Sequence, residues 1–182
     1  MSRALRSWPT RWLALLALAA AVHLAAVWAL PRAIMWRLAS GGSSNMPSEG
    51  GVLLPPMTDH TQRRVVMPSP DLLYAICSYD LATRPLRLRA DPKLPTYWSI
   101  ALYAANSDNF FVLNDRQAGG QPVDLLLVGP GGATPPDLAK GTRVVATPSA
   151  RGLVLMRVLV SDPAHGLATA ETARRSLRCE PA

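Results

Sequence analysis

One uninterrupted apolar segment, Trp12–Leu30 (WLALLALAAAVHLAAVWAL), most constrains how this chain folds. It has 19 residues and no charged side chain, and His23 is its only polar member. As a helix rising about 1.5 Å per residue it would be roughly 28 Å long, close to the ~30 Å hydrocarbon thickness of a bilayer. A buried helix of a soluble domain normally has a polar face, and this segment has none. We therefore expect a transmembrane helix at residues 12–30.

Basic and aromatic residues flank the span and indicate its orientation. The α-amino group, Arg3, Arg6 and Arg11 precede it, whereas Arg32 and Arg37 follow it, and the first acidic residue is Glu49. This charge bias predicts a cytoplasmic tail at residues 1–11 and export of everything beyond the span. Four tryptophans bracket the span as interfacial anchors do: Trp8, Trp12, Trp28 and Trp36.

The span leaves two alternatives open. A cleaved signal peptide is the rival interpretation, but the apolar run exceeds the usual ~7–15 residues and Trp28–Arg37 contains no small-x-small cleavage site. His23 in a membrane helix can mark a proton or metal site, but no second ionisable group accompanies it, so we expect a neutral packing residue. We expect the helix to kink or leave the membrane at Leu30–Pro31, because proline removes a backbone donor.

The positive charge of the chain is concentrated beside the span. Of the formal net charge of +7, residues 1–40 carry +5 and residues 41–182 carry +2. A basic groove is therefore not predicted, and no RNA- or DNA-binding motif is present. The expected partners are the lipid bilayer, through residues 12–30, and an envelope protein or a small ligand; nucleic acid is not expected.

The exported part, about 140 residues, is long enough for one core. It contains 15 of the 17 prolines, which indicates short elements joined by tight turns. In an oxidising compartment the two cysteines, Cys77 and Cys179, form a disulfide pair. Metal ligation by this pair is the weaker alternative, because neither a CxxC spacing nor a histidine cluster supports it.

Alternating and apolar runs predict a mainly β domain (α+β) at residues 52–182, after a juxtamembrane segment and Gly/Ser linker at 31–51. A helical period follows in the tail, where Leu167, Ala170, Arg174 and Leu177 recur up to Cys179. We expect an antiparallel β-sandwich with a C-terminal helix packed against it. The expected strands are Arg63–Met67, Leu72–Tyr79, Leu86–Arg89, Tyr97–Ala104, Phe110–Leu113, Val123–Val128, Arg143–Ala146 and Gly152–Val160.

Four stretches in this order carry a family resemblance: SYDLATRPLRL, PTYWSIALYAANSDNFFVLND, DLLLVGPGG and TPSARGLVLMRVLV. From about Met67 to Cys179 the sequence resembles the bacterial domain-of-unknown-function family 1254, in particular its short membrane-anchored branch. That branch has a histidine in its span and a cysteine in the early strand and near the end, so the resemblance implies a Cys77–Cys179 bridge. It also implies a bacterial inner-membrane protein with a periplasmic domain. The larger members carry an Asn-Asn-Asp-Thr-like stretch and a second β domain that this sequence does not show, so the resemblance implies a fold and no chemistry.

Few residues point to catalysis. Asp59–His60 would need a nucleophile such as Ser69 or Ser149, and no GxSxG elbow is present. A metal site joining His60 and His165 with Asp59 and Asp162 has no support from their spacing, and we expect no metal. Gly129–Gly132 lacks the Lys-Ser/Thr of a phosphate loop, and we expect no cofactor.

Arg157 stands alone in an apolar strand, where a charge is costly unless it is paired. We expect a structural ion pair with Asp80 or Asp108, and binding of a ligand carboxylate is the alternative. A polar and aromatic pocket at one end of the sheet is a further candidate ligand site, with Tyr97, Tyr103, Asn109, Asn114 and Arg116. The favoured function is an anchored envelope protein that binds a partner or ligand. A hydrolase-like enzyme using Asp59, His60 or Arg157 is the alternative.

Overall fold

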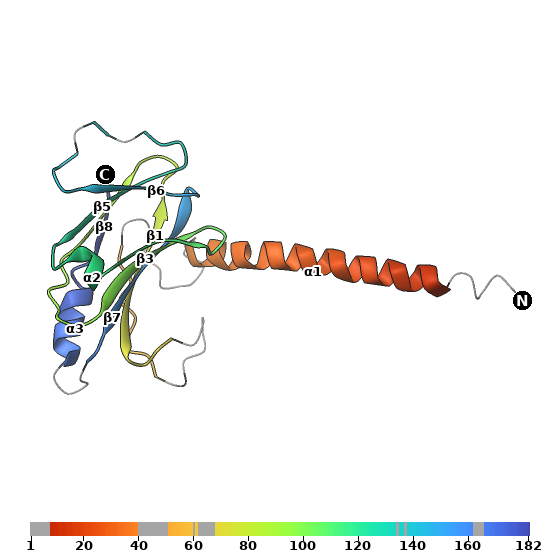
Figure 1. Cartoon of the computed structure of the whole chain (residues 1–182), viewed down its shortest axis with the longest axis horizontal. Helices are drawn as coiled ribbons and strands as arrows, with labels where there is room; N and C mark the ends of the chain where they lie inside the picture. Colours follow the sequence, from red (N-terminus) through yellow and green to blue (C-terminus); the bar gives the residue numbers. More distant parts are fainter. Residues whose placement is uncertain are drawn as a thin grey trace, which may run out of the picture.

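The structure is a computed structural model, which describes residues 8–39, 51–59, 61, 68–133, 135–136, 138–161 and 166–182. In these residues one long N-terminal helix leads to a domain of two four-stranded sheets and two short helices (Figure 1). The expected strand Arg63–Met67, residues 1–7 of the basic tail and residues 40–50 of the linker lie outside the described residues.

Helix α1 spans Trp8–Ala39, so it includes the predicted span and continues well beyond it. Pro31 lies inside the helix, so the helix does not end at Leu30–Pro31, and the kink or membrane exit expected there stays a prediction. A proline in a helix removes one backbone hydrogen bond, and the turns on either side retain theirs. The segment Pro9–Ala39 is long and apolar enough to cross a membrane, and its most apolar window is not buried by any of the described chain.

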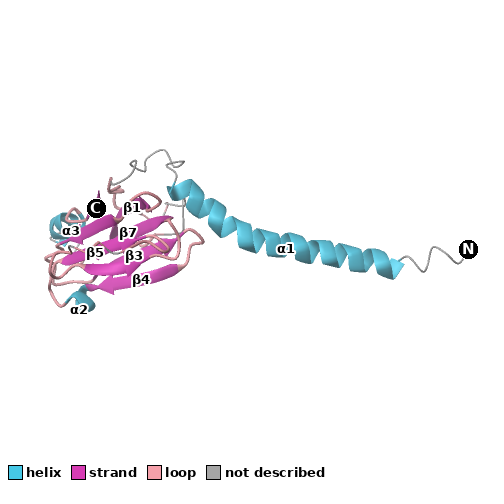
Figure 2. Ribbon diagram, turned by 90° about the horizontal axis from the view of Figure 1, so that it is seen from above, coloured by secondary structure: helices cyan, strands magenta, loops and turns pink. Residues whose placement is uncertain are grey.

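The last turns of α1 contact the domain at the ends of β1 (Leu72–Asp80) and β7 (Arg151–Leu159) (Figures 1 and 2). Met35 is 6% exposed at this junction, whereas Trp36 beside it is 65% exposed. The helix therefore reaches from the apolar span directly to the domain.

The domain is a sandwich of two sheets, and every strand pair is antiparallel except β5–β6. The first sheet has the order β1-β7-β3-β4, with β3 at Trp98–Ala104 and β4 at Asn109–Asn114. The second has the order β6-β5-β2-β8, with strands Arg143–Ala146, Val123–Val128, Leu86–Ala90 and Arg178–Pro181. The predicted mainly β, antiparallel fold with a C-terminal helix is confirmed.

The core lies between the two sheets because alternate residues of each strand point inward. On β3 these are Trp98, Ile100 and Leu102, as their period-2 spacing predicts, and all are at most 3% exposed. They pack in one cluster with residues of the second sheet such as Leu88 and Leu125. Burial of this apolar surface is the main stabilising contribution to such a domain.

The C-terminal region differs from the expected single helix. Helix α3 spans only Gly166–Arg174, and after a turn the chain forms strand β8, which pairs with β2. Leu177, expected on the helix, enters the core at 1% exposure. Helix α2, Asp115–Ala118, was also not expected, and its capping box uses the side chains of Asn114 and Gln117.

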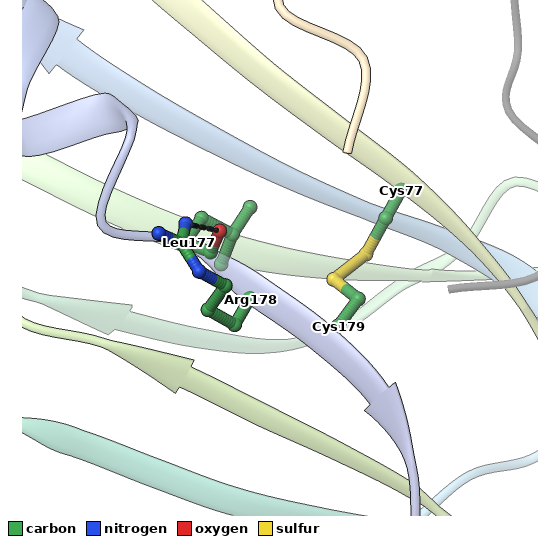
Figure 3. Close-up of a disulfide and its surroundings, with 4 residues drawn as sticks. All are labelled: Cys77, Leu177, Arg178 and Cys179. Carbon is green, nitrogen blue, oxygen red and sulfur yellow. Dashed lines mark hydrogen bonds between the residues drawn. A yellow bond between two sulfur atoms is a disulfide. The ribbon is translucent and has the colours of Figure 1, made fainter. Parts of the chain in front are cut away.

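A disulfide between Cys77 and Cys179 links the two sheets (Figure 3). Cys77 lies on β1 and Cys179 on β8, with their Cα atoms 6.7 Å apart. Both are at most 1% exposed, so the bond is inside the core. It ties the last strand to the first across a sequence separation of 102 residues.

Tyr79 and Gly152 form a tight crossing at one end of the first sheet. The Tyr79 hydroxyl donates to the backbone oxygen of Tyr103 at 3.0 Å and thus passes over β7 from β1 to β3. A Cβ on Gly152 would overlap both the Tyr79 hydroxyl and the Tyr103 oxygen, so only glycine fits there. Burial raises the pKa of Tyr79 to about 12.

We expect removal of the disulfide to destabilise the domain substantially. The Cys77→Ala/Cys179→Ala variant should lose about 2–4 kcal/mol in the free energy of unfolding, because its unfolded chain is no longer constrained by a long covalent loop. Urea unfolding of the full chain in detergent measures this loss. Two free thiols in the untreated protein, detected by non-reducing mass measurement, would contradict the assignment.

Tyr79 should make the domain sensitive to alkali. In the unfolded chain its hydroxyl ionises near the ordinary pKa of 10.0, whereas the folded protein holds the proton up to about 12. The unfolded state therefore binds fewer protons between these values, and the free energy of unfolding falls as the pH rises from about 10 to 12. Urea unfolding across this range should show a steeper loss for the wild type than for Tyr79→Phe. Parallel losses would show that the shift is absent.

Candidate functional site

The outward side of the β1-β7-β3-β4 sheet carries polar, aromatic and aliphatic side chains that point away from the core. Figure 2 shows these four strands side by side. The register places Arg157 at the centre of a row, opposite Tyr74 on β1 and Ser99 on β3. We define the Arg157 face as the outward residues Tyr74, Ile76, Leu155, Arg157, Ser99, Ala101, Tyr103, Val112 and Asn114.

Arg157 is a half-buried cation on a surface of aliphatic, aromatic and uncharged polar side chains. Its Nη2 donates to the Tyr103 hydroxyl at 2.8 Å, and the described residues provide no carboxylate for it. The neighbours on its own strand and face are Leu155 and Leu159. A guanidinium has five N–H donors, so most of the donors of Arg157 remain available to a ligand.

The expected ion pair of Arg157 with Asp80 or Asp108 is wrong. Asp80 lies opposite Arg151 in the register and accepts from its Nε at 2.7 Å. Arg157 is six residues further along β7, about 20 Å away at the usual strand rise. Asp108 accepts from the Asn106 side chain at 2.6 Å in the β3–β4 turn. The Arg151 guanidinium, through its hydrogen bond, lowers the pKa of Asp80.

The structure brings together only some of the expected pocket residues. Tyr103 contacts Arg157, and the Tyr97 hydroxyl donates to the Ser99 hydroxyl at 2.8 Å. Asn114 lies in the same row as Ser99, but its side-chain oxygen accepts from the backbone of Gln117 at 2.9 Å and caps α2. Asn109 lies opposite Tyr103 at a bulge, and Arg116 belongs to α2. Ligand binding by this set stays a prediction.

The residues considered for hydrolysis have other roles where they are described. Asp59 accepts from the backbone of Thr61 at 2.7 Å within its own loop, and His60 lies outside the described residues. The Ser149 hydroxyl donates to the Arg151 oxygen at 2.7 Å and accepts from Ala105, so it serves the turn before β7. His165 and Asp162 also lie outside the described residues, and in the rest no group of three or more His, Cys, Asp or Glu side chains is arranged to hold a metal.

A second arginine, Arg174 on α3, is structural. It is 6% exposed, and its Nε donates to the Glu171 carboxylate at 2.5 Å. Its Nη1 donates to the backbone oxygens of Pro55 at 2.5 Å and Tyr74 at 3.1 Å, so it joins α3, β1 and the segment before β1. The hydrogen bond from Arg174 lowers the pKa of Glu171. Its place among the apolar residues of the tail was the sequence signal for such a buried role.

Comparison with known proteins agrees with this fold. Residues 52–181 match the family described as "Protein of unknown function (DUF1254)". No curated protein matches the chain. Among solved structures, the VPA0106 protein from Vibrio parahaemolyticus has a TM-score of 0.60 at 13% identity, covering 83% of this chain and 34% of that one. A putative uncharacterized protein from Burkholderia cenocepacia has a TM-score of 0.44 at 16% identity, covering 71% and 34%. The first shares the fold, and this chain spans about a third of the length of each.

The two arginines should respond oppositely to replacement by leucine. Arg157→Leu removes a cation for which the described residues provide no counter-charge and places a third leucine beside Leu155 and Leu159, so the free energy of unfolding should stay within about 1 kcal/mol of wild type or rise. Arg174→Leu leaves the backbone oxygens of Pro55 and Tyr74 without this donor and leaves Glu171 with Arg175 alone, so it should cost about 2–4 kcal/mol. Urea unfolding of both variants checks this contrast. An Arg157→Leu loss as large as that of Arg174→Leu would assign Arg157 a structural role.

Proposed function

This chain belongs to the DUF1254 family of proteins of unknown function, and we propose that it is a single-pass inner-membrane protein whose periplasmic domain binds a partner. In this proposal residues 12–30 cross the bilayer with the N-terminus in the cytoplasm. The Arg157 face binds a carboxylate-bearing segment of an envelope protein.

The character of α1 supports the membrane anchor. Trp12, Leu16 and Leu24 are each more than half exposed, at 56%, 65% and 68%, although they are among the most apolar side chains of the chain. In a bilayer this surface would contact lipid, whereas in water the helix would expose a large apolar area to solvent. The excess of arginines before the span supports the orientation.

The Cys77–Cys179 disulfide supports export. A buried disulfide that links the first and last strands of a domain is typical of proteins folded in an oxidising compartment. It agrees with the orientation derived from the flanking charges, because both support a domain outside the cytoplasm.

Arg157 is the observation that carries the binding proposal. A half-buried guanidinium without a carboxylate gains more from an ion pair than an exposed one, since it is already partly desolvated. Tyr103 orients it through the 2.8 Å hydrogen bond, and the surrounding Leu155, Ile76 and Val112 offer apolar contact. An Arg anchor within an apolar and aromatic surface is the usual composition of a protein-binding hot spot.

We expect the orientation to be visible by cysteine labelling. In cells with a permeabilised outer membrane, a membrane-impermeant maleimide should label Gln121→Cys, on an exposed turn of the domain, and should not label Ser2→Cys. The native cysteines are joined to each other and do not react. The reverse labelling pattern would overturn the proposed topology.

Partner binding is testable by photo-crosslinking in cells. A photoreactive amino acid at Val112, which is 44% exposed on the Arg157 face, should give a defined adduct, and one at Arg89 on the other sheet should not. Arg157→Gln should weaken the adduct by about tenfold or more, as expected for a lost charged hydrogen bond. The control Arg89→Gln should leave it unchanged. Equal adducts at both positions, or insensitivity to Arg157→Gln, would exclude this face as the binding site.

A further inference from the structure

A cavity of about 420 Å³ lies where α1 meets the domain. Its helical wall consists of Arg32, Met35, Trp36 and Ala39, whose spacing places them on one side of α1. The opposite wall comes from the β3–β4 turn and the start of β7, at the end of the sandwich that α1 reaches in Figure 1.

The walls are largely apolar and carry two arginines. Arg32 lies over the Trp28 ring at 4.4 Å and donates Nη1 to the Trp28 oxygen at 2.6 Å, and the described residues give it no carboxylate partner. Arg151 is paired with Asp80 through Nε. The wall carboxylate, Asp108, is held by the Asn106 side chain at 2.6 Å. Of the two arginines, Arg32 is therefore the one that no described carboxylate neutralises.

The position of the cavity relative to the span identifies the kind of anion. No charged residue lies between Arg11 and Arg32, and this run of 20 residues is about 30 Å long as a helix. If the span is inserted as proposed, Arg32 lies at the level of the outward headgroups, and the remaining wall residues follow within two turns. Met35 and Trp36 then lie about one helical turn farther from the bilayer centre than Arg32, among the headgroups, where tryptophan is common.

We propose that this cavity binds the headgroup of an anionic phospholipid, with the phosphate at Arg32 and Arg151, the headgroup alcohol toward Met35 and Trp36, and the acyl chains directed back along the span. This inference rests on the proposed membrane insertion of α1. A planar guanidinium binds phosphate oxygens in a bidentate manner, and phosphate is the anion that the bilayer supplies at this height. The bound lipid joins helix and domain at one site.

The test uses the full chain in nanodiscs of phosphatidylcholine containing a minor fraction of phosphatidylglycerol. Native mass spectrometry of the released protein should detect retained phosphatidylglycerol in excess of its share in the disc. Arg32→Gln should lower that retention by about fivefold or more. Arg37→Gln, a matched loss of charge on the same helix outside the cavity, should not. Ala105→Trp, which fills the cavity and keeps both arginines, should lower retention as Arg32→Gln does.

Each other outcome overturns a defined part of the proposal. Equal retention in the Arg32→Gln and Arg37→Gln variants would mean that lipid is held by charge alone, and the cavity proposal would fail. Displacement of the lipid by millimolar glycerol 3-phosphate would indicate a site for a soluble anion instead. Failure of the wild-type chain to remain with the nanodisc would overturn the membrane anchor itself. Arg157→Gln should retain lipid normally, which separates this site from the partner-binding face.

Discussion

Strand β7 is paired with β1 on one side and β3 on the other, and this double pairing determines most of the geometry of the domain. Its inward residues Val154, Met156 and Val158 are all fully buried in the core, while Arg157 lies on the opposite face. A shift of one residue would exchange these two sets. The crossing of Tyr79 over Gly152 opposes such a shift, because no other residue of the strand would fit beneath that hydroxyl.

Local patterns in the sequence predicted much of this domain. The bounds of Val123–Val128 and Arg143–Ala146 agree with those of β5 and β6, and the inward spacing of Trp98, Ile100 and Leu102 is correct. Strand β8 was not predicted, because its four residues are too few to show an alternating hydrophobic pattern, and it is defined by its pairing with β2. The continuation of α1 through Pro31 was also missed, because a proline can remain inside a helix when only one of its hydrogen bonds is lost.

The sequence indicated which residues belong to the candidate site, but it did not indicate which residues they contact. Arg157 stands out in the sequence as a charge within an apolar strand, but its neighbour depends on the register between strands distant in sequence. In that register Asp80 pairs with Arg151, and Arg157 donates a hydrogen bond to the Tyr103 hydroxyl. Arg174 is equally isolated in its helical pattern, and the fold surrounds it with a carboxylate and two backbone oxygens. The same residue type is thus structural in one place and available in the other, according to the acceptors that the fold brings to it.

The direct contact between α1 and the sandwich limits how far this protein can act from the bilayer. From Arg32 to Ala39 the helix advances only about 11 Å. With the span inserted as proposed, the domain lies close to the lipid surface, because only this short helical segment separates it from the span. The Arg157 face then stays within one domain diameter of the bilayer surface. It changes direction when the whole helix rotates about its own axis. The molecules it can capture are those that diffuse in, or along, the same two-dimensional layer.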